Sequence, residues 1–204
     1  MPSLAIVVEG YGDVAAVPAI LGRVGNAFGV NAYAANPPIR VKGLAQLVRP
    51  GELERWVKLA QSRDGVDRVL FVIDVDEGCP VSLRSDFETR IQQMGNAVTK
   101  PVSFCLIKAE FETWFLADAE NLKLALPEYG WADNVAVIDP SNRRGAKELL
   151  DSLLLGSSYK ETRDQEIMAR KIDIKSLYAS DRSFKRFVKC VTSLDYDDLD
   201  FLAT

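Results

Sequence analysis

Residues 69–78 read VLFVIDVDEG, an uninterrupted apolar run followed at once by two aspartates and a glycine. A short continuous run of β-branched and aromatic residues is typical of a strand buried on both faces of a parallel sheet. Asp74 and Asp76 point to the same side while the chain stays extended, and Gly78 permits the tight turn that follows. The stretch therefore predicts a central parallel strand that carries two carboxylates at its carboxyl end.

The N-terminal stretch has the same arrangement. Residues 4–8, LAIVV, form another short apolar run, and the sequence EGYGD follows directly at residues 9–13. Glu9 thus stands at the tip of a second predicted strand. Asp13 is expected to cap a helix that extends to about residue 25.

Strands and helices alternate through the first half of the chain. Further strands are expected at residues 30–35 with 39–41, interrupted by Pro37 and Pro38, and at 102–107, and helices are expected from residue 50 and over 86–94. This order predicts an α/β fold, with a parallel sheet of about four strands, right-handed crossovers and helices on both faces. Such sheets bind ligands beyond the carboxyl ends of their strands, near the point where the strand order reverses. If the first and third strands are neighbours, Glu9 faces Asp74 and Asp76 at that point.

The second half of the chain is predicted to be helical. Helices are expected at residues 111–116, 143–154 and 162–172, the last with a capping box formed by Thr162 and Gln165, and a final helix is expected after a cap at Asp181. The break between residues 126 and 140, marked by Pro127, Gly130 and Pro140, predicts a boundary. We expect an α/β domain over residues 1–126 and a C-terminal helical extension over residues 127–204, packed on the first.

The composition excludes several classes of site. The chain has no histidine, which rules out Ser-His-Asp and Cys-His catalysis and the histidine-based metalloprotease motifs. Its three cysteines form no CxxC pair, so neither a zinc ribbon nor a disulfide framework is indicated. Oxygen ligands favour a hard cation, Mg²⁺ or Mn²⁺. No apolar run is long enough for a membrane helix and the N-terminus lacks the features of a signal peptide, so we expect a cytoplasmic protein.

The charge is unevenly distributed along the chain. The net charge is −4, but residues 141–190 hold 12 lysines and arginines against 7 acidic residues, and residues 1–140 hold 13 against 18. A basic segment after an acidic one is compatible with contact to phosphate groups. On charge alone, a solvated helical surface is the simpler interpretation.

The pairing of EGxxD after the first strand with DxDxxG after the third resembles the TOPRIM domain over roughly residues 3–118. TOPRIM domains occur in type IA and II topoisomerases, bacterial primases, recombination-repair proteins and nucleases of the OLD family. The resemblance implies a TOPRIM- or Rossmann-like sheet in which Asp74 and Asp76 coordinate Mg²⁺ (or Mn²⁺). It also implies that Glu9 is a general acid or base, or a metal ligand.

A narrower resemblance extends to about residue 187. The segment AEFETWFLAD at residues 109–118 is similar to the EFExW segment of a small bacterial TOPRIM-like family of unknown function, as are Gly145–Glu148, Tyr159 with Lys160, and Asp164 with Gln165. Members of that family are often encoded beside an ATPase, in two-gene systems linked to phage defence. The resemblance implies an ATPase as a partner protein.

These patterns yield a set of candidate site residues. The catalytic candidates are Glu9, Asp74, Asp76 and Lys147, and the metal-ligand candidates are Glu9, Asp74, Asp76, Glu110 and Glu112. A second-metal role for Glu110 and Glu112 competes with a simpler interpretation, since acids are favoured at the start of a helix. Lys147 is either a cation near a bound phosphodiester or a surface charge.

Several other residues have simpler expected roles. Trp114 and Phe115 are predicted to lie in the core, and Asp118 to cap a helix. Glu77 either adds charge to the site or faces solvent. Tyr11 and Tyr159 are not expected to be nucleophiles, because the nucleophilic tyrosines of topoisomerases come from a domain that this chain lacks.

Three functions are compatible with the pattern. The first is Mg²⁺-dependent nuclease chemistry on nucleic-acid phosphodiesters, with DNA ahead of RNA as substrate. The second is a non-catalytic or partner-activated module that docks an ATPase. The third is a haloacid-dehalogenase-like phosphatase. That family has its nucleophilic aspartate on the first strand of the core, whereas the DxD sequence here follows the third, and this function would also leave Glu9 unexplained.

Overall fold

The computed structural model describes residues 2–133, 135 and 144–203. Its sheet contains four strands, β1 (Ser3–Val8), β2 (Tyr33–Arg40), β3 (Arg68–Asp74) and β4 (Val102–Ile107). Their order is β2-β1-β3-β4 and each neighbouring pair is parallel. The chain passes outward from β1 to β2 and then returns to β3 on the other side of β1. The strand order therefore reverses between β1 and β3, and the predicted α/β class with a four-stranded parallel sheet is confirmed.

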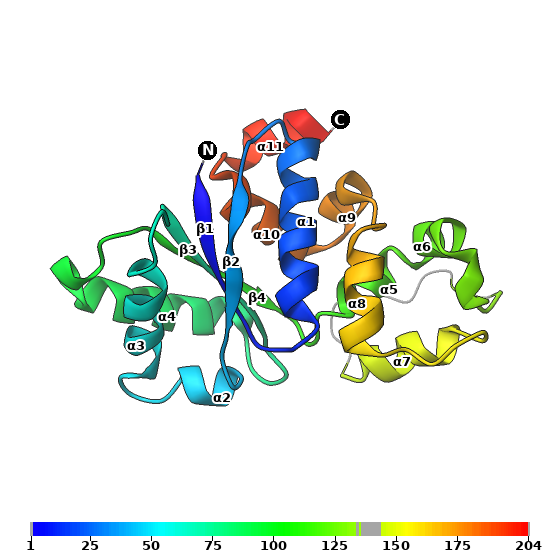
Figure 1. Cartoon of the computed structure of the whole chain (residues 1–204), viewed down its shortest axis with the longest axis horizontal. Helices are drawn as coiled ribbons and strands as arrows, with labels where there is room; N and C mark the ends of the chain where they lie inside the picture. Colours follow the sequence, from blue (N-terminus) through cyan, green and yellow to red (C-terminus); the bar gives the residue numbers. More distant parts are fainter. Residues whose placement is uncertain (1, 134, 136–143, 204) are drawn as a thin grey trace.

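Helices flank the sheet on both faces (Figure 1). In the first half they are α1 (Asp13–Ala27), α2 (Leu44–Leu47), α3 (Glu52–Gln61) and α4 (Pro80–Gln93), with a short 3-10 turn η1 (Gly95–Ala97). In the second half they are α5 (Thr113–Ala117), α6 (Ala119–Ala125), α7 (Ala146–Leu153), α8 (Glu161–Ala169), α9 (Ile174–Ser180), α10 (Arg182–Thr192) and α11 (Tyr196–Ala203), with a 3-10 turn η2 (Pro127–Tyr129). The C-terminal helical extension predicted from the sequence is present.

Alternate residues of the central strands point into two separate layers of the core. Leu4, Ile6 and Val8 of β1 pack into one apolar cluster, while Ala5 and Val7 pack into the other. This is the period of two that a strand imposes on its side chains. The first cluster is closed by α1 and the C-terminal helices, and the second by α3 and α4.

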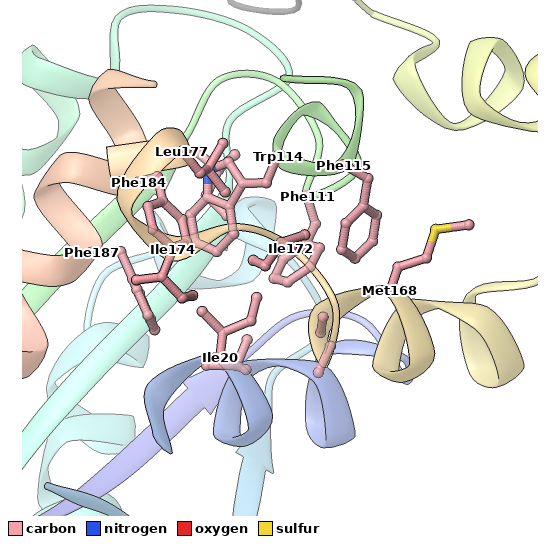
Figure 2. Packing of buried hydrophobic residues seen from close by; sticks show 14 of the residues in the cluster. Ile20, Phe111, Trp114, Phe115, Met168, Ile172, Ile174, Leu177, Phe184 and Phe187 are labelled. Carbon is pink, nitrogen blue, oxygen red and sulfur yellow. The ribbon is translucent and has the colours of Figure 1, made fainter. Parts of the chain in front are cut away.

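An aromatic group connects α5 to α10 in the first of these layers (Figure 2). Trp114 is fully buried, its ring centroid lies 5.0 Å from that of Phe184 and 5.3 Å from that of Phe187, and its Nε1 donates a hydrogen bond of 2.7 Å to Ser183 Oγ. Phe115 is also buried, so both predicted core residues are confirmed. The C-terminal helices thus complete the core beneath the sheet.

Several element boundaries differ from the sequence-based expectation. α4 begins at Pro80, six residues earlier than expected, because proline is well accepted in the first turn of a helix. β2 is one strand from Tyr33 to Arg40, but its register with β1 shifts at Pro37 and Pro38, where Ala5 opposite Ala35 is followed by Val7 opposite Ile39. The predicted interruption is therefore an irregularity within an edge strand. The helices α2, α6, α9 and α11 were not anticipated, since α2, α6 and α9 span only four to seven residues and a period of 3.6 is weakly expressed in so few turns.

Of the caps expected for α1, α8 and α10, two are wrong and one is confirmed. Asp13 lies inside α1, whose N-cap is Gly12, and the capping box of Thr162 and Gln165 does not form. At the start of α8 the Lys160 N–H donates instead to Asp164 Oδ2 at 2.7 Å. Asp181 caps α10 as expected, accepting a 2.7 Å hydrogen bond from the Phe184 N–H.

Two of the expected features lie outside the described residues, namely the helix start at Arg143 and the boundary residue Pro140. The division into residues 1–126 and 127–204 stays a prediction. Within the ranges described, no helix has the length and apolar character needed to cross a membrane.

Candidate functional site

The carboxyl ends of β1 and β3 bring the first two candidate acids together. β1 pairs with β3 in parallel, with Val8 opposite Val72, so Glu9 and Asp74 follow at neighbouring strand tips. The two carboxyls are close enough for the charge of Glu9 to raise the pKa of Asp74, although burial has the larger effect. This is the edge of the sheet where a parallel α/β fold binds its ligands.

Glu9 is half-buried at this edge and is held by the segment after β2. Burial raises the pKa of the Glu9 carboxyl, the charges of Asp76 and Asp13 raise it further, and a hydrogen bond from the Leu44 N–H opposes the shift. Gly43 has φ of +95°, and a Cβ at that position would lie 2.7 Å from Glu9 Oε1. Glycine at residue 43 is therefore required both by the backbone conformation and by the close approach of Glu9.

Asp74 lies at the centre of a group of carboxyls. Its Oδ2 accepts a 3.1 Å hydrogen bond from the Phe111 N–H. Burial raises its pKa well above the ordinary range, and the nearby charges of Asp13 and Glu112 raise it further. Asp76 is exposed and lies beside Glu9, since its charge raises the Glu9 pKa. Glu9, Asp74 and Asp76 thus share one edge of the sheet.

Asp13 is a member of this group that the sequence interpretation assigned to a helix cap. Its carboxyl is buried, with Oδ2 accepting from the Gly10 N–H at 2.7 Å and Oδ1 accepting from Gln165 Nε2 at 2.8 Å. Burial raises its pKa, and the two hydrogen bonds oppose that shift. Asp13 therefore joins Glu9 and Asp74, and α8 holds it there through Gln165.

Glu112 is the other buried acid of the group. Its side chain is 5% exposed, and its Oε1 accepts a 2.9 Å hydrogen bond from the Tyr159 hydroxyl. Burial raises its pKa to about 7, and the charges of Glu161 and Asp13 contribute in the same direction. The structure thus brings Glu112 to the carboxyl cluster, which we define as Glu9, Asp13, Asp74, Asp76 and Glu112.

Glu110 has a different environment although it lies only two residues away. Its Oε1 accepts a 2.8 Å hydrogen bond from the Gly145 N–H, and its Oε2 accepts a 2.9 Å bond from the Lys147 N–H. Both carboxylate oxygens therefore satisfy backbone donors at the start of α7. The structure gives Glu110 the role of a helix cap supplied from another part of the chain.

Lys147 reaches the margin of the cluster from the first turn of α7. Its Nζ forms an ion pair with Glu161, which raises the lysine pKa, and the charge of Glu112 contributes to the same shift. The lysine therefore remains a cation at neutral pH beside the buried acids. Glu77 is exposed and pairs instead with Arg144 at 2.5 Å.

The other residues of the basic segment lie outside the cluster. Arg163 pairs with the buried Asp164, and Arg170 pairs with Glu166 within α8. Lys160 is exposed. Tyr159 is buried, and both burial and Glu112 raise its pKa. Asp118 occupies the N-cap position of α6 as predicted, but its side chain forms no capping hydrogen bond with that helix. Its Oδ2 accepts instead from Asn121 Nδ2 and the Asp173 N–H.

The cluster fits a hard divalent cation by the chemistry of its donors. All five side chains offer carboxylate oxygens, and among the described residues none of the five forms an ion pair with lysine or arginine. In the described part of the chain, no three acidic or cysteine side chains are gathered tightly enough to hold a metal ion as they stand. Mg²⁺ nevertheless needs only one or two protein carboxylates, because it retains several waters and takes phosphate oxygens. Asp74 with Glu9, Asp76 or Asp13 meets that requirement.

Two grooves lie elsewhere, along the outer side of α1. One has a volume of about 690 Å³ and runs between α1, β2 and α8, and the other, of about 570 Å³, lies between α1 and the start of α9. They share Arg23 and Asn26, and neither is lined by an acid of the carboxyl cluster. The candidate site is therefore identified by the chemistry of its side chains and by the strand order, and it lies at an open edge of the sheet.

Comparison with known proteins places the whole of this site within one family. The model of a domain of unknown function, DUF4276, matches residues 8–191, a range that includes every acid of the cluster as well as Lys147, Tyr159 and Gln165. No curated protein matches the chain, and no solved structure matches it. The family match covers far more than half of the 204 residues. The chain belongs to the DUF4276 family.

Proposed function

We propose that this protein is a Mg²⁺-dependent nuclease that hydrolyses nucleic-acid phosphodiesters at the carboxyl cluster. The observation that carries the proposal is the position of Glu9, Asp13 and Asp74 together at the reversal of strand order in a parallel sheet. The similarity of the EGxxD and DxDxxG motifs to TOPRIM domains supports the choice of nucleic acid, and of DNA before RNA, as the substrate.

The chain offers a distinct role for each group. Asp74 and Asp76 would hold Mg²⁺ (or Mn²⁺), together with Asp13 or Glu9. When bound, the cation would polarise a phosphoryl oxygen and acidify a coordinated water. Glu9, whose orientation is fixed by the Leu44 N–H and Gly43, is placed to accept a proton from an attacking water.

Two groups from the second half of the chain support the cluster, Gln165 of α8 and Tyr159 in the loop before α8. Gln165 fixes one oxygen of Asp13, and Tyr159 fixes one oxygen of Glu112. Lys147, charged and beside Glu112, would neutralise negative charge that develops on the phosphate. A partner ATPase, which the TOPRIM-like family resemblance implies, would act on this same chain from outside the cluster.

The test is cleavage of supercoiled plasmid, single-stranded DNA and RNA in Mg²⁺, Mn²⁺ or EDTA. We expect cleavage that requires the metal and that falls by at least about 100-fold in Asp74→Asn, since loss of a metal ligand exceeds the effect of losing its supporting contacts. Asp64→Asn is the matched control, because Asp64 is an exposed aspartate in the turn before β3, at the opposite end of the same strand.

The outcomes separate the three functions. Cleavage that persists in a folded Asp74→Asn protein contradicts the assignment of the site. The absence of cleavage under every condition contradicts an autonomous nuclease and favours the partner-activated module. Hydrolysis of a phosphomonoester analogue, with no attack on nucleic acid, favours the phosphatase.

A further inference from the structure

An exposed tyrosine and an arginine form a stacked pair beside the carboxyl cluster. Tyr11 lies in the loop between β1 and α1, two residues after Glu9, and its side chain is 68% exposed. The guanidinium carbon of Arg40 lies 3.9 Å from the centroid of the Tyr11 ring, and Arg40 Nη2 donates a 3.1 Å hydrogen bond to the Tyr11 hydroxyl. The pair joins the loop after β1 to the last residue of β2.

The strand register fixes the position of this pair relative to the acids. Arg40 is the register partner of Val8, the residue before Glu9, and the Val41 N–H donates to the Val8 carbonyl at 2.9 Å. Adjacent strands lie about 4.8 Å apart. The backbone of Arg40 is therefore about one strand spacing from the end of β1, on the side away from Asp74.

The charge on Arg40 is available to a ligand. Among the described residues, no aspartate or glutamate forms an ion pair with Arg40 or with Lys42, which is exposed two residues further along. Both residues belong to the end of β2 or the segment directly after it, one strand away from the end of β1. An anionic ligand that extended from the carboxyl cluster to Arg40 and Lys42 would contact positive charge on the β2 side of the acids.

The tyrosine ring is equally available. Because Arg40 covers one face of the ring while 68% of the side chain stays exposed, the other face is open to solvent. The arginine also holds the ring in one orientation, which lowers the entropy lost when a planar group stacks on it. The open face of the Tyr11 ring therefore offers a surface on which a nucleic-acid base can stack. The neighbouring Arg40 guanidinium can contact the phosphate attached to that base.

We propose that Tyr11 stacks on an unpaired base of the substrate and that Arg40 binds the adjoining phosphate, so that the protein acts on single-stranded nucleic acid. This inference rests on the proposed nuclease function and names its substrate class. In a duplex each base is already stacked between its neighbours and would have to be unstacked first, so a single strand reaches Tyr11 more readily.

The test is the affinity of the full chain for dye-labelled oligonucleotides by fluorescence anisotropy, in Ca²⁺ in place of Mg²⁺, with integrity of the DNA checked on a gel. Three ligands are compared: oligothymidine, an abasic strand of the same length, and a duplex. For Tyr11→Ala we expect oligothymidine to bind roughly five- to 150-fold more weakly, the range given by loss of one stacked base, and the abasic strand to bind as before.

Matched variants separate stacking from folding. Tyr33→Ala removes another exposed tyrosine, at the opposite end of β2, and should leave every affinity unchanged. Tyr11→Phe should retain the affinity, and Tyr11→Leu, which keeps apolar volume without a ring, should lose it. Arg40→Gln should weaken the binding of the abasic strand as well as that of oligothymidine, and should lower the salt slope of binding by about 0.7, the value for one phosphate contact on a single strand.

The results distinguish this inference from the function on which it rests. If oligothymidine binds the wild-type chain and Tyr11→Ala equally well, the stacking role is overturned while the nuclease proposal stands. A preference of the wild-type chain for the duplex likewise overturns the single-strand inference alone. If none of the three ligands binds the wild-type chain, both proposals are overturned.

Discussion

Gly12, in the loop after β1, lies in close contact with α8. A Cβ at Gly12 would lie 1.7 Å from Gln165 Oε1 and 2.8 Å from the backbone oxygen of Glu161. We predict that Gly12→Ala destabilises the fold by about 1–3 kcal/mol, the usual result of adding a methyl group to a closed contact. It should also weaken divalent-metal binding, since Gln165 holds Asp13.

Gly22 provides the matched control for this substitution. Gly22 lies inside α1, whereas Gly12 is the N-cap of that helix, and Gly22 is exposed. A Cβ added at Gly22 would have no neighbouring atom within 4 Å. Gly22→Ala should stabilise the protein by up to about 1 kcal/mol, because alanine favours the helix interior over glycine. Urea denaturation of both variants checks the pair, and a stable Gly12→Ala protein contradicts the close contact.

The raised pKa of Asp118, which lies outside the carboxyl cluster, predicts that the stability of the protein depends on pH. Burial raises its pKa from 3.8 to about 6. A carboxyl with a raised folded-state pKa holds its proton more tightly when folded, so the free energy of unfolding falls as pH rises from about 4 to 6 and stays lower above that range. Asp118→Asn keeps an oxygen acceptor for Asn121 and Asp173 but cannot ionise.

The expected result is a smaller loss of stability between pH 4.5 and 7 in Asp118→Asn than in the wild-type chain, by about 1–2 kcal/mol. The measurement is urea denaturation at the two pH values. An unchanged pH dependence would show that Asp118 ionises in the folded state as it does in the unfolded one.

At the scale of single elements, α7 depends on an acid from a distant part of the chain. Glu110 accepts hydrogen bonds from the Gly145 and Lys147 N–H groups at the start of that helix. We predict that Glu110→Ala lowers the free energy of unfolding by about 1–2 kcal/mol, as loss of a helix cap does, while leaving the affinity for Mn²⁺ unchanged. Denaturation and metal titration on the same variant test this prediction. A large loss of metal affinity would show that Glu110 is a metal ligand after all.

The strands were more predictable from sequence than the helix ends. Continuous apolar runs at 4–8 and 69–73 predict buried parallel strands directly, and the structure has β1 and β3 there. The caps were less predictable because Asp, Gln and Glu side chains satisfy backbone donors nearby or far away equally well. Gln165 binds Asp13, 152 residues away in sequence, and no local pattern contains that contact.

At the scale of the whole molecule, the C-terminal helices belong to the core beneath the sheet. Phe184 and Phe187 of α10 pack on Trp114, and Met168 and Leu177 lie in the same cluster as the residues of β1 and α1. Figure 2 shows Trp114, Phe184 and Phe187 gathered over Ile20 of α1, with Leu177 beside them. Without the C-terminal segment this apolar surface would face water.

We therefore predict that a chain ending at residue 126 does not fold cooperatively by itself. Removing these partners exposes a large apolar area and deletes Gln165 and Tyr159 from the surroundings of the carboxyl cluster. Circular dichroism during urea denaturation, together with hydrogen exchange, is the measurement. A cooperative, protected fold in the shortened chain would support the predicted boundary between residues 126 and 127 as a true domain boundary.

The site was predictable from sequence only where strand topology decides it. Glu9, Asp74 and Asp76 follow apolar runs, so their shared edge could be anticipated from the rule for parallel sheets. Asp13 lies within the EGxxD motif, but a helix cap explained it equally well. The environment of Glu112 depends on Tyr159, and that of Glu110 on α7, so only the packing of the second half of the chain distinguishes the two acids.

The most direct test of the carboxyl cluster is Mn²⁺ binding, measured by electron paramagnetic resonance of free and bound ion. The wild-type chain should bind Mn²⁺ saturably, Mg²⁺ should compete, and Asp74→Asn should weaken binding by at least about 100-fold while Asp64→Asn binds as the wild type does. Absence of saturable binding in the wild-type chain, or equal binding by Asp74→Asn, would contradict the account.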